Sequence, residues 1–211
     1  MRDIHSIGQA FKIVSERTAK GVPECLLYGK GGKKQESSPQ KLRGKIKILF
    51  YGGRQAGMIV LLTLKALGQD VIVIPEDEII KQTAKDLSLI TFDKKTLSDE
   101  SKMDFLITQG FDLFVCCHGR KIIKKQLLNK IPSINLHPCL YKYKGATPIK
   151  RMLADRITKA SVACHHMTEK VDDGETIIEV FKEVTGRTEV EVYNELYPVY
   201  SEVIIRAIQK L

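Results

Sequence analysis

From Lys45 onward, short apolar runs alternate with longer segments in which apolar residues recur at helical spacing. The run IKILFYGG, closed by paired glycines, predicts a strand, and AGMIVLLTLKALG after it predicts a helix that ends at Gly68. DVIVIP and FDLFVCCHG predict two further buried strands, with a charged and helical stretch between them. Strands that alternate with helices form a parallel sheet with right-handed crossovers. The pattern therefore predicts an α/β domain over residues 45–211, with a mostly parallel sheet flanked by helices.

The second half of this domain has a different pattern. SINLHP and SVACHHMTE predict strands, and TPIKRMLADR between them predicts a helix. The closing segment TEVEVYNELYPVYSEVIIRAIQKL has apolar residues at helical intervals, with a kink or break expected at Pro198.

Residues 1–44 have the composition of an extension outside this domain. Apolar residues at helical spacing predict a helix over His5–Lys20, and the Gly, Lys and Ser mixture after it predicts a flexible linker. The extension carries nine Lys or Arg residues against four Asp or Glu residues, whereas the rest of the chain carries 25 against 21. More than half of the net charge of +9 therefore lies in the extension, and the rest of the chain has only a small excess of basic residues. Such an excess is ordinary for a soluble enzyme and is poor evidence for a nucleic-acid partner.

Composition indicates a globular cytoplasmic protein. The 211 residues are 43% hydrophobic, enough for a full core, and no apolar stretch approaches the roughly 18 residues that span a bilayer. The N-terminus has no continuous apolar segment typical of a signal peptide. The cysteines are odd in number, form no CxxC pair and lie mostly in apolar runs, so we expect neither disulfides nor a metal site; they are Cys25, Cys116, Cys117, Cys139 and Cys164.

Three segments are candidates for a functional site. The turn GGRQAG follows the first predicted strand but lacks both the GxGxxG spacing and a Walker Lys-Ser/Thr pair, which favours a simple tight turn. Asn135 and His137 lie two apart at a strand end and therefore on one face, where a histidine can be catalytic or structural. The acidic turn Val171–Gly174 can supply a carboxylate that orients an imidazole, or can be an Asx turn.

The order of motifs around these residues is more specific than any one of them. The stretch from Ile134 to Ile178 resembles the formyltransferase family that includes the methionyl-tRNA and glycinamide ribonucleotide formyltransferases. The family's motifs recur here as Asn135-Leu136-His137-Pro138, Lys144-Gly145-Ala146-Thr147-Pro148, His165 and Val171-Asp172-Asp173-Gly174. VCCHGRKIIKKQLL is similar to the family's folate-loop strand, and IKILFYGG to its first strand. The resemblance runs from about Lys45 to the C-terminus and implies the family's Rossmann-like fold.

The resemblance implies a catalytic trio of Asn135, His137 and Asp172 and a co-substrate, 10-formyltetrahydrofolate, without a metal. Asn135 would donate a hydrogen bond to the formyl oxygen, His137 would manage the proton, and Asp172 would orient both. This agrees with the chemistry, because amine attack on a formyl carbon creates an oxyanion and requires a base.

The pterin is expected to meet backbone groups of two segments. The residues implied as cofactor-binding are Arg120, Lys121, Ile122, Thr168, Val171 and Asp172. Asp173 replaces the family's usual Gly or Thr, so the choice of Asp172 over its neighbour relies on aligning Gly174.

Two departures bear on the acceptor, which the resemblance implies is a primary amine. The glycinamide ribonucleotide enzymes' phosphate loop is missing after the first strand, and the chain ends at Leu211 without the C-terminal domain of methionyl-tRNA formyltransferases. In both respects the chain looks more like the sugar-nucleotide N-formyltransferases, and this resemblance implies an amino group on a nucleotide-linked sugar as acceptor, with initiator tRNA as the second choice.

A formyltetrahydrofolate hydrolase and a non-catalytic folate-binding protein remain open as alternatives. No membrane partner is expected, and the oligomeric state is left open, with a homodimer among the candidates.

Overall fold

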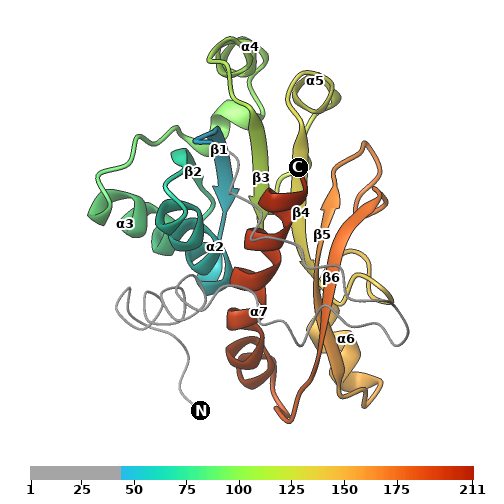
Figure 1. Ribbon diagram of the computed structural model, residues 1–211. Coiled ribbons are helices and arrows are strands. Elements are labelled where there is room, and N and C mark those ends of the chain that lie inside the picture. Colours follow the sequence, from blue (N-terminus) through green and yellow to red (C-terminus); the bar gives the residue numbers. More distant parts are fainter. Residues whose placement is uncertain (1–43) are drawn as a thin grey trace, which may run out of the picture.

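A computed structural model describes residues 44–211, so the helix and linker predicted for the N-terminal extension lie outside the described residues. Six strands form one sheet (Figure 1): β1 Lys47–Gly52, β2 Asp70–Pro75, β3 Leu113–Cys117, β4 Ser133–Pro138, β5 Lys159–His166 and β6 Thr176–Glu183. The helices are α2 Arg54–Ala66, α3 Glu78–Asp86, the 3₁₀ turn η2 Lys94–Leu97, α4 Glu100–Thr108, α5 Lys125–Leu128, α6 Pro148–Ala154 and α7 Glu189–Lys210.

The strand order is β2-β1-β3-β4-β5-β6, and the pairs among the first four strands in this order are parallel. This confirms the predicted mostly parallel α/β sheet. The pairs β4–β5 and β5–β6 are antiparallel, and β6 was not predicted. TIIEVFKE lies at the sheet edge with mostly half-buried or exposed residues, so it lacks the apolar run that identifies the inner strands.

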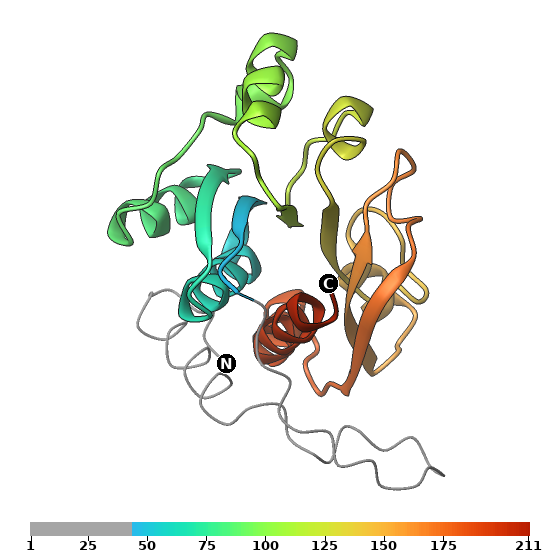
Figure 2. The ribbon, with the colours of Figure 1, turned by 45° about the horizontal axis from the view of Figure 1, so that its top comes forward.

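Two layers of apolar side chains enclose the sheet. On one face, α2 and α7 lie side by side over the sheet (Figure 2). The core between these helices and the sheet includes Ile48, Phe50 and Ile134. On the other face, Leu49 and Phe114 pack with side chains of α4 and α5. Because successive strand residues point to opposite faces, β1 and β3 contribute to both layers.

Helix α7 runs unbroken through Pro198, so the break considered at this proline does not occur. Its start is secured by a capping box in which the Thr188 side chain accepts from the Glu191 N–H while the Glu191 carboxylate accepts from the Thr188 N–H. Burial of one helix face, which includes Val192, Leu196 and Tyr200, holds α7 on the sheet despite the hydrogen bond that proline cannot make.

Cys116, Cys117, Cys139 and Cys164 are free and buried, as their apolar surroundings predicted, whereas Cys25 lies outside the described residues. Within residues 44–211, no helix has the length and apolar character needed to cross a bilayer.

We expect Thr188→Ala to lower the free energy of unfolding by about 1 kcal/mol, because it removes the side-chain half of the capping box. Urea denaturation of the two proteins measures this difference. The control is Thr108→Ala, since that exposed hydroxyl bonds a carbonyl at the end of α4 and its loss should change stability by less than about 0.5 kcal/mol. Equal effects of the two substitutions would contradict the capping role.

Candidate active site

The site is built on the face of β4 that points away from α2 and α7. Ile134 and Leu136 point into the core beneath those helices, so the alternating residues Asn135 and His137 point to the other side. In the antiparallel register with β5, His165 lies opposite Asn135. Directly opposed residues of neighbouring strands have Cβ atoms roughly 5 Å apart, so the pairing itself brings the amide and the imidazole together.

The segment between β5 and β6 folds back over this face and delivers Asp172. It is held at its base by the Met167 N–H, which donates to the Ser133 carbonyl (2.8 Å). Gly174 is required there, because a Cβ at this position would lie 1.8 Å from the His166 carbonyl oxygen. Asp172 itself has a φ of +53°, a left-handed conformation that aspartate tolerates better than most residues. The acidic-Gly turn thus has a steric basis.

The Asp172 carboxylate joins the pieces of the site. Its Oδ2 accepts from the Gly145 N–H (2.8 Å) and lies 3.1 Å from His137 Nε2, while Oδ1 accepts from Asn135 Nδ2 (3.3 Å) and lies 3.6 Å from His165 Nε2. Burial alone would raise the pKa of this carboxyl, but the hydrogen bonds from His137 and from the Gly145 N–H hold the pKa well below its usual range. Asp172 is therefore a buried and permanently ionised carboxylate at neutral pH.

His137 is oriented through one ring nitrogen. Its Nε2 lies 3.1 Å from both Asp172 Oδ2 and the Gly145 carbonyl oxygen, two acceptors that place the proton on Nε2. The other nitrogen, Nδ1, is buried and has no hydrogen-bond partner among the described residues. A buried nitrogen with a free lone pair can accept a proton from a bound molecule, and the carboxylate behind the ring would stabilise the resulting imidazolium.

The Asn135 amide points into the protein rather than outward. His165 Nδ1 donates to the His166 carbonyl (2.8 Å), which leaves His165 Nε2 as an acceptor for Asn135 Nδ2 at 3.2 Å. With the bond to Asp172, both hydrogens of the amide are engaged. Both bonds are long, so the amide can release one of them at low energetic cost when a stronger acceptor binds.

The two neighbouring aspartates have separate environments. The Asp172 side chain is 7% exposed, whereas Asp173 is about half exposed and pairs with Lys144 Nζ at 2.6 Å. The hydrogen bond and the charge of Lys144 also lower the pKa of Asp173, but this ion pair lies on the protein surface. The residue that faces Asn135 and His137 is Asp172.

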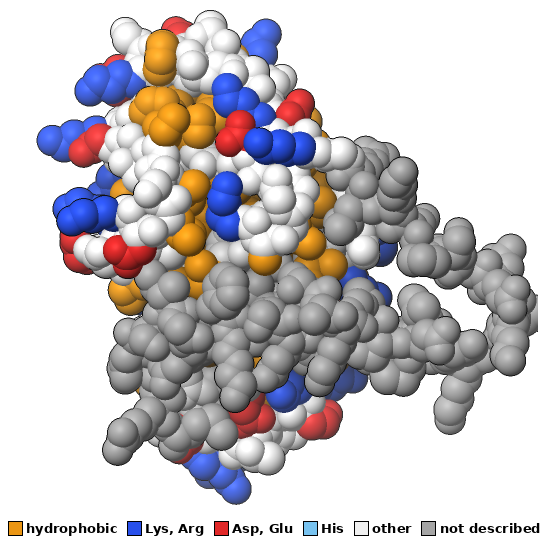
Figure 3. Space-filling model, turned by 60° about the vertical axis from the view of Figure 1, so that its left-hand side comes forward, with side chains coloured by type: hydrophobic (Ala, Val, Ile, Leu, Met, Phe, Trp, Pro, Cys, Tyr) orange, Lys and Arg blue, Asp and Glu red, His pale blue; other side chains and the backbone are white. Residues whose placement is uncertain are grey.

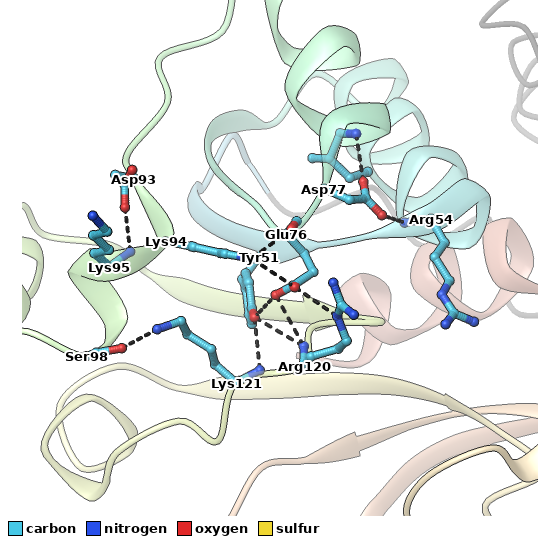
Figure 4. A network of polar contacts seen from close by, with 11 residues as sticks. Tyr51, Arg54, Glu76, Asp77, Asp93, Lys94, Lys95, Ser98, Arg120 and Lys121 are labelled. Carbon is cyan, nitrogen blue, oxygen red and sulfur yellow. Dashed lines mark hydrogen bonds and ion pairs between the residues drawn. The ribbon is translucent and has the colours of Figure 1, made fainter.

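The residues predicted to meet the pterin form two adjoining segments. Lys125 at the start of α5 pairs with Glu169 (2.7 Å), which brings the segment after β3 next to the β5–β6 turn. Ile122 and Val171 are apolar but 76% and 60% exposed. The backbone N–H groups of Arg120 and Lys121 donate to the Tyr51 hydroxyl at 3.1 and 3.0 Å and are already used inside the protein (Figure 4). Thr168 is exposed, and its hydroxyl donates to the Lys170 carbonyl (3.0 Å).

The GGRQAG turn forms one wall of a pocket between the N-terminal ends of α2 and α7. Its lining residues are Arg54, Gln55, Ala56, His118, Glu189, Val190, Tyr193 and Tyr197. His118 directly follows β3, and His137 lies near the end of β4. Because these two strands are parallel, the pocket and the Asn135–His137 face both lie at the carboxyl ends of the strands. The Arg54 side chain extends away from the polar cluster of Tyr51 and Glu76 in Figure 4.

Sequence reasoning left several residues of this site without a role. His165 was recognised as part of a motif, but its bond to Asn135 depends on the β4–β5 register, which cannot be derived from the motif. The Gly145 backbone bridges His137 and Asp172, and its φ of +81° accounts for the motif glycine. His118 and Tyr51 had no signal beyond their residue types.

The chain is similar in sequence to known formyltransferases. The family model "Formyl transferase" matches residues 34–208. A methionyl-tRNA formyltransferase of Campylobacter jejuni is 27% identical over 142 residues, which are 67% of this chain and 47% of that protein. The chain therefore spans about half the length of the relatives it matches in sequence.

Solved structures share the fold at low identity. Glycinamide ribonucleotide transformylase 1 from Symbiobacterium toebii superposes with a TM-score of 0.67 and 18% identity, over 85% of this chain and 92% of that one. An N-formyltransferase from Helicobacter canadensis, in complex with folinic acid and dTDP-3-aminofucose, gives a TM-score of 0.61 and 16% identity, over 78% and 63% of the two chains. These likenesses show the fold.

We expect the stabilisation from the Asp172 carboxylate to depend on pH. In the unfolded chain the Asp172 carboxyl has its ordinary pKa of 3.8, and in the folded protein its pKa is lower. The carboxylate therefore contributes its full stabilisation at a pH well above 3.8, and this contribution is lost as the pH falls toward the folded-state pKa. The difference in unfolding free energy between the wild type and Asp172→Asn, on the order of 1–3 kcal/mol at pH 7, should therefore shrink between about pH 5 and pH 2. Urea denaturation across this range measures it.

The matched control is Asp173→Asn, whose exposed ion pair is screened by solvent. Its stability difference from the wild type should be smaller at every pH. A difference for Asp172→Asn that stays constant with pH would show that the carboxylate does not hold its charge in the folded state.

Proposed function

Because this chain belongs to the formyl transferase family, we propose that it moves a formyl group from 10-formyltetrahydrofolate to a primary amine on a nucleotide-linked sugar. The observation that carries the transfer chemistry is the cluster of Asn135 with the buried His137 and Asp172, in which one imidazole nitrogen is left without a partner among the described residues. The co-substrate supplies an activated formyl group, and the chain's side chains manage charge and protons around it.

His137 is the proposed proton acceptor. The attacking amine forms a bond to the formyl carbon and must lose a proton, which His137 Nδ1 takes while Asp172 stabilises the imidazolium through Nε2. As the bond between the formyl carbon and the folate nitrogen breaks, that nitrogen takes up a proton. His137 therefore returns what it received and ends the cycle neutral.

Asn135 is the proposed donor to the developing negative charge on the formyl oxygen. An anionic oxygen is a stronger acceptor than a neutral imidazole, so one amide hydrogen would leave His165 Nε2 for the formyl oxygen. The bond to Asp172 holds the amide in place during this exchange. Asn135 would then bind the charged form better than the neutral substrate, which is the requirement for catalysis.

The folate half of the proposal is supported by the two adjoining segments after β3 and β5. They expose apolar side chains at Ile122 and Val171, and no hydrogen-bond partner within residues 44–211 meets the backbone of Ile122. An apolar surface with a few unpaired polar groups is what a planar heterocycle with polar edges requires. The folinic acid bound to the Helicobacter canadensis enzyme is consistent with a ligand of this class.

The acceptor half is supported by the pocket beside Arg54. Burial lowers the pKa of His118 to about 3, with further lowering by the charges of Arg54 and His137, so its ring is neutral and bonds Tyr200 Oη (2.8 Å). Tyr193 packs edge-on to His118 with ring centres 5.5 Å apart, and Tyr197 stacks on Tyr193. Aromatic faces beside an arginine at a helix N-terminus suit a heterocyclic base and a phosphate.

A second candidate is formylation of aminoacylated initiator tRNA, favoured by the methionyl-tRNA formyltransferases among the sequence relatives. A basic surface would be expected for that partner. On the face that carries α3 and α4, basic side chains are instead interspersed with acidic ones (Figure 3), including the pairs Lys81–Glu78 and Lys102–Asp99. We therefore place the nucleotide-linked sugar first.

Incubation with 10-formyltetrahydrofolate and a panel of nucleotide-linked amino sugars should release tetrahydrofolate with at least one acceptor. A response to aminoacylated initiator tRNA alone would establish the second candidate. Release without any amine would identify a formyltetrahydrofolate hydrolase, and absence of release under all conditions would leave a folate-binding protein.

We expect Asn135→Ala to lower kcat by about 100- to 1,000-fold, because it removes the donor to the formyl oxygen. Its unfolding transition should remain cooperative, since the side chain is only partly buried. Asp173→Asn should retain kcat within about threefold, because its carboxylate faces Lys144 on the surface. Equal activity of Asn135→Ala and the wild type would remove Asn135 from the mechanism.

A further inference from the structure

A buried tyrosine fixes the backbone of the segment after β3. Tyr51, at the end of β1, is fully buried, and its hydroxyl donates to Glu76 Oε2 while accepting from two consecutive backbone N–H groups, those of Arg120 and Lys121 (Figure 4). One donated and two accepted hydrogen bonds satisfy a hydroxyl completely. Its ring packs against Gly119, where a Cβ would lie 2.2 Å from the Tyr51 ring.

Glu76 anchors this tyrosine from the end of β2. Its side chain is 5% exposed, and Oε1 accepts from Arg120 Nε at 3.0 Å and from Lys94 Nζ at 3.2 Å. Burial opposes ionisation, but these hydrogen bonds and that from Tyr51 lower the pKa of Glu76. Burial and the bond to Glu76 raise the pKa of Tyr51. The proton therefore stays on the tyrosine, which keeps both lone pairs available to the backbone.

The two N–H groups decide which way the peptide units face. The described peptide bonds are all trans, so each C=O points opposite to the N–H of the same unit. With the N–H groups of Arg120 and Lys121 turned to Tyr51, the carbonyls of Gly119 and Arg120 point away from it. Tyr51 thus sets the direction of the hydrogen-bonding groups that this segment presents.

We infer that Tyr51 and Glu76 are positioning residues that hold residues 119–122 in the conformation that binds the folate. The inference rests on the proposed function, which assigns this segment to the co-substrate. The hydroxyl acts through the backbone and does not touch the reacting atoms. The Arg120 side chain, which is 74% exposed, serves the network through its salt bridge with Glu76 and is less important than its backbone N–H.

The test compares Tyr51→Phe with the wild type in two measurements. Calorimetric titration with folinic acid gives Kd without turnover, and steady-state kinetics with the best acceptor of the panel gives KM and kcat. Phenylalanine removes the acceptor of the Lys121 N–H and leaves the Arg120 N–H only a 3.5 Å contact with Glu76 Oε2. The segment should therefore rearrange, and Kd and the KM for 10-formyltetrahydrofolate should rise at least about tenfold. At saturating folate, kcat should stay within about threefold.

A control variant separates positioning from stability. Tyr143→Phe removes the hydroxyl of another buried tyrosine, which donates to the Asp155 carboxylate at 2.7 Å, and should lower stability without changing Kd. An increase in Kd for Tyr143→Phe that equals that of Tyr51→Phe would overturn the inference.

The remaining outcomes are also decisive. Should Tyr51→Phe fail to fold, Glu76→Gln is the alternative variant. A carboxamide has one acceptor oxygen where the carboxylate has two, so it cannot accept from the Tyr51 hydroxyl and also from Arg120 and Lys94, and a severalfold increase in Kd is expected. An unchanged Kd would overturn the inference. Unchanged folinic acid binding by a folded Tyr51→Phe would refute positioning but leave formyl transfer intact. Weaker binding by this variant, in a protein that transfers no formyl group to any amine, would support positioning and refute the transferase. A wild type that binds no folinic acid would overturn both.

Discussion

One buried carboxylate connects parts of the chain that are distant in sequence. Asp172 receives the Gly145 N–H from the segment before α6, contacts His137 and Asn135 on β4, and lies beside His165 on β5. An ionised group at this depth is stable only when hydrogen-bond donors surround it, so the donors and the carboxylate require each other. The conformation of the β5–β6 turn, the left-handed backbone of Asp172 and the glycine at 174 all follow from bringing the carboxylate there.

The Asn135–His137 cluster and the pocket beside Arg54 lie on opposite faces of the sheet. The Asn135–His137 face is opposite the one covered by α2 and α7, whereas the pocket beside Arg54 lies where those two helices begin. Both lie at the carboxyl ends of the strands, because β3 and β4 are parallel and end at the same level of the sheet. Ligands of α/β proteins usually bind at the carboxyl ends of parallel strands, where helix N-termini and loops meet. Ligands bound at these two places would thus lie on different sides of the sheet.

Two buried carboxylates, those of Glu76 and Asp172, are of similar chemical type but have different hydrogen-bond partners. Glu76 and Asp172 are both buried carboxylates with a lowered pKa, yet Glu76 is engaged with Tyr51, Arg120 and Lys94, and Asp172 with two histidines. Among the described residues, the second network has a buried side-chain nitrogen without a partner, His137 Nδ1, whereas the first network has none. The partners of a carboxylate therefore indicate its role better than its pKa does.

Much of this molecule could be predicted because local patterns agree with the final contacts. The inner strands are continuous apolar runs, α2 and α7 have apolar faces, and the spacing of Asn135 and His137 places them on one side of a strand regardless of context. The edge strand β6 was missed because half-exposed residues give no such run, and Pro198 did not end α7 because burial of the helix outweighs one absent hydrogen bond.

By itself, the sequence determined the α/β class, the shared face of Asn135 and His137 and the glycine-bearing turn, since each depends on neighbouring residues and on the period of a strand or helix. Only the tertiary structure decided that Asp172 and not Asp173 faces the histidines, that both hydrogens of the Asn135 amide point inward, and that Tyr51 binds the backbone of residues 120 and 121. The contacts of Asp172 with His137, of Asn135 with its two partners and of Tyr51 with the backbone join residues 30 to 70 positions apart. Adjacent aspartates have the same local pattern. Hydrogen bonds depend on direction as well as proximity, and direction is set when the strands pair and the turns close.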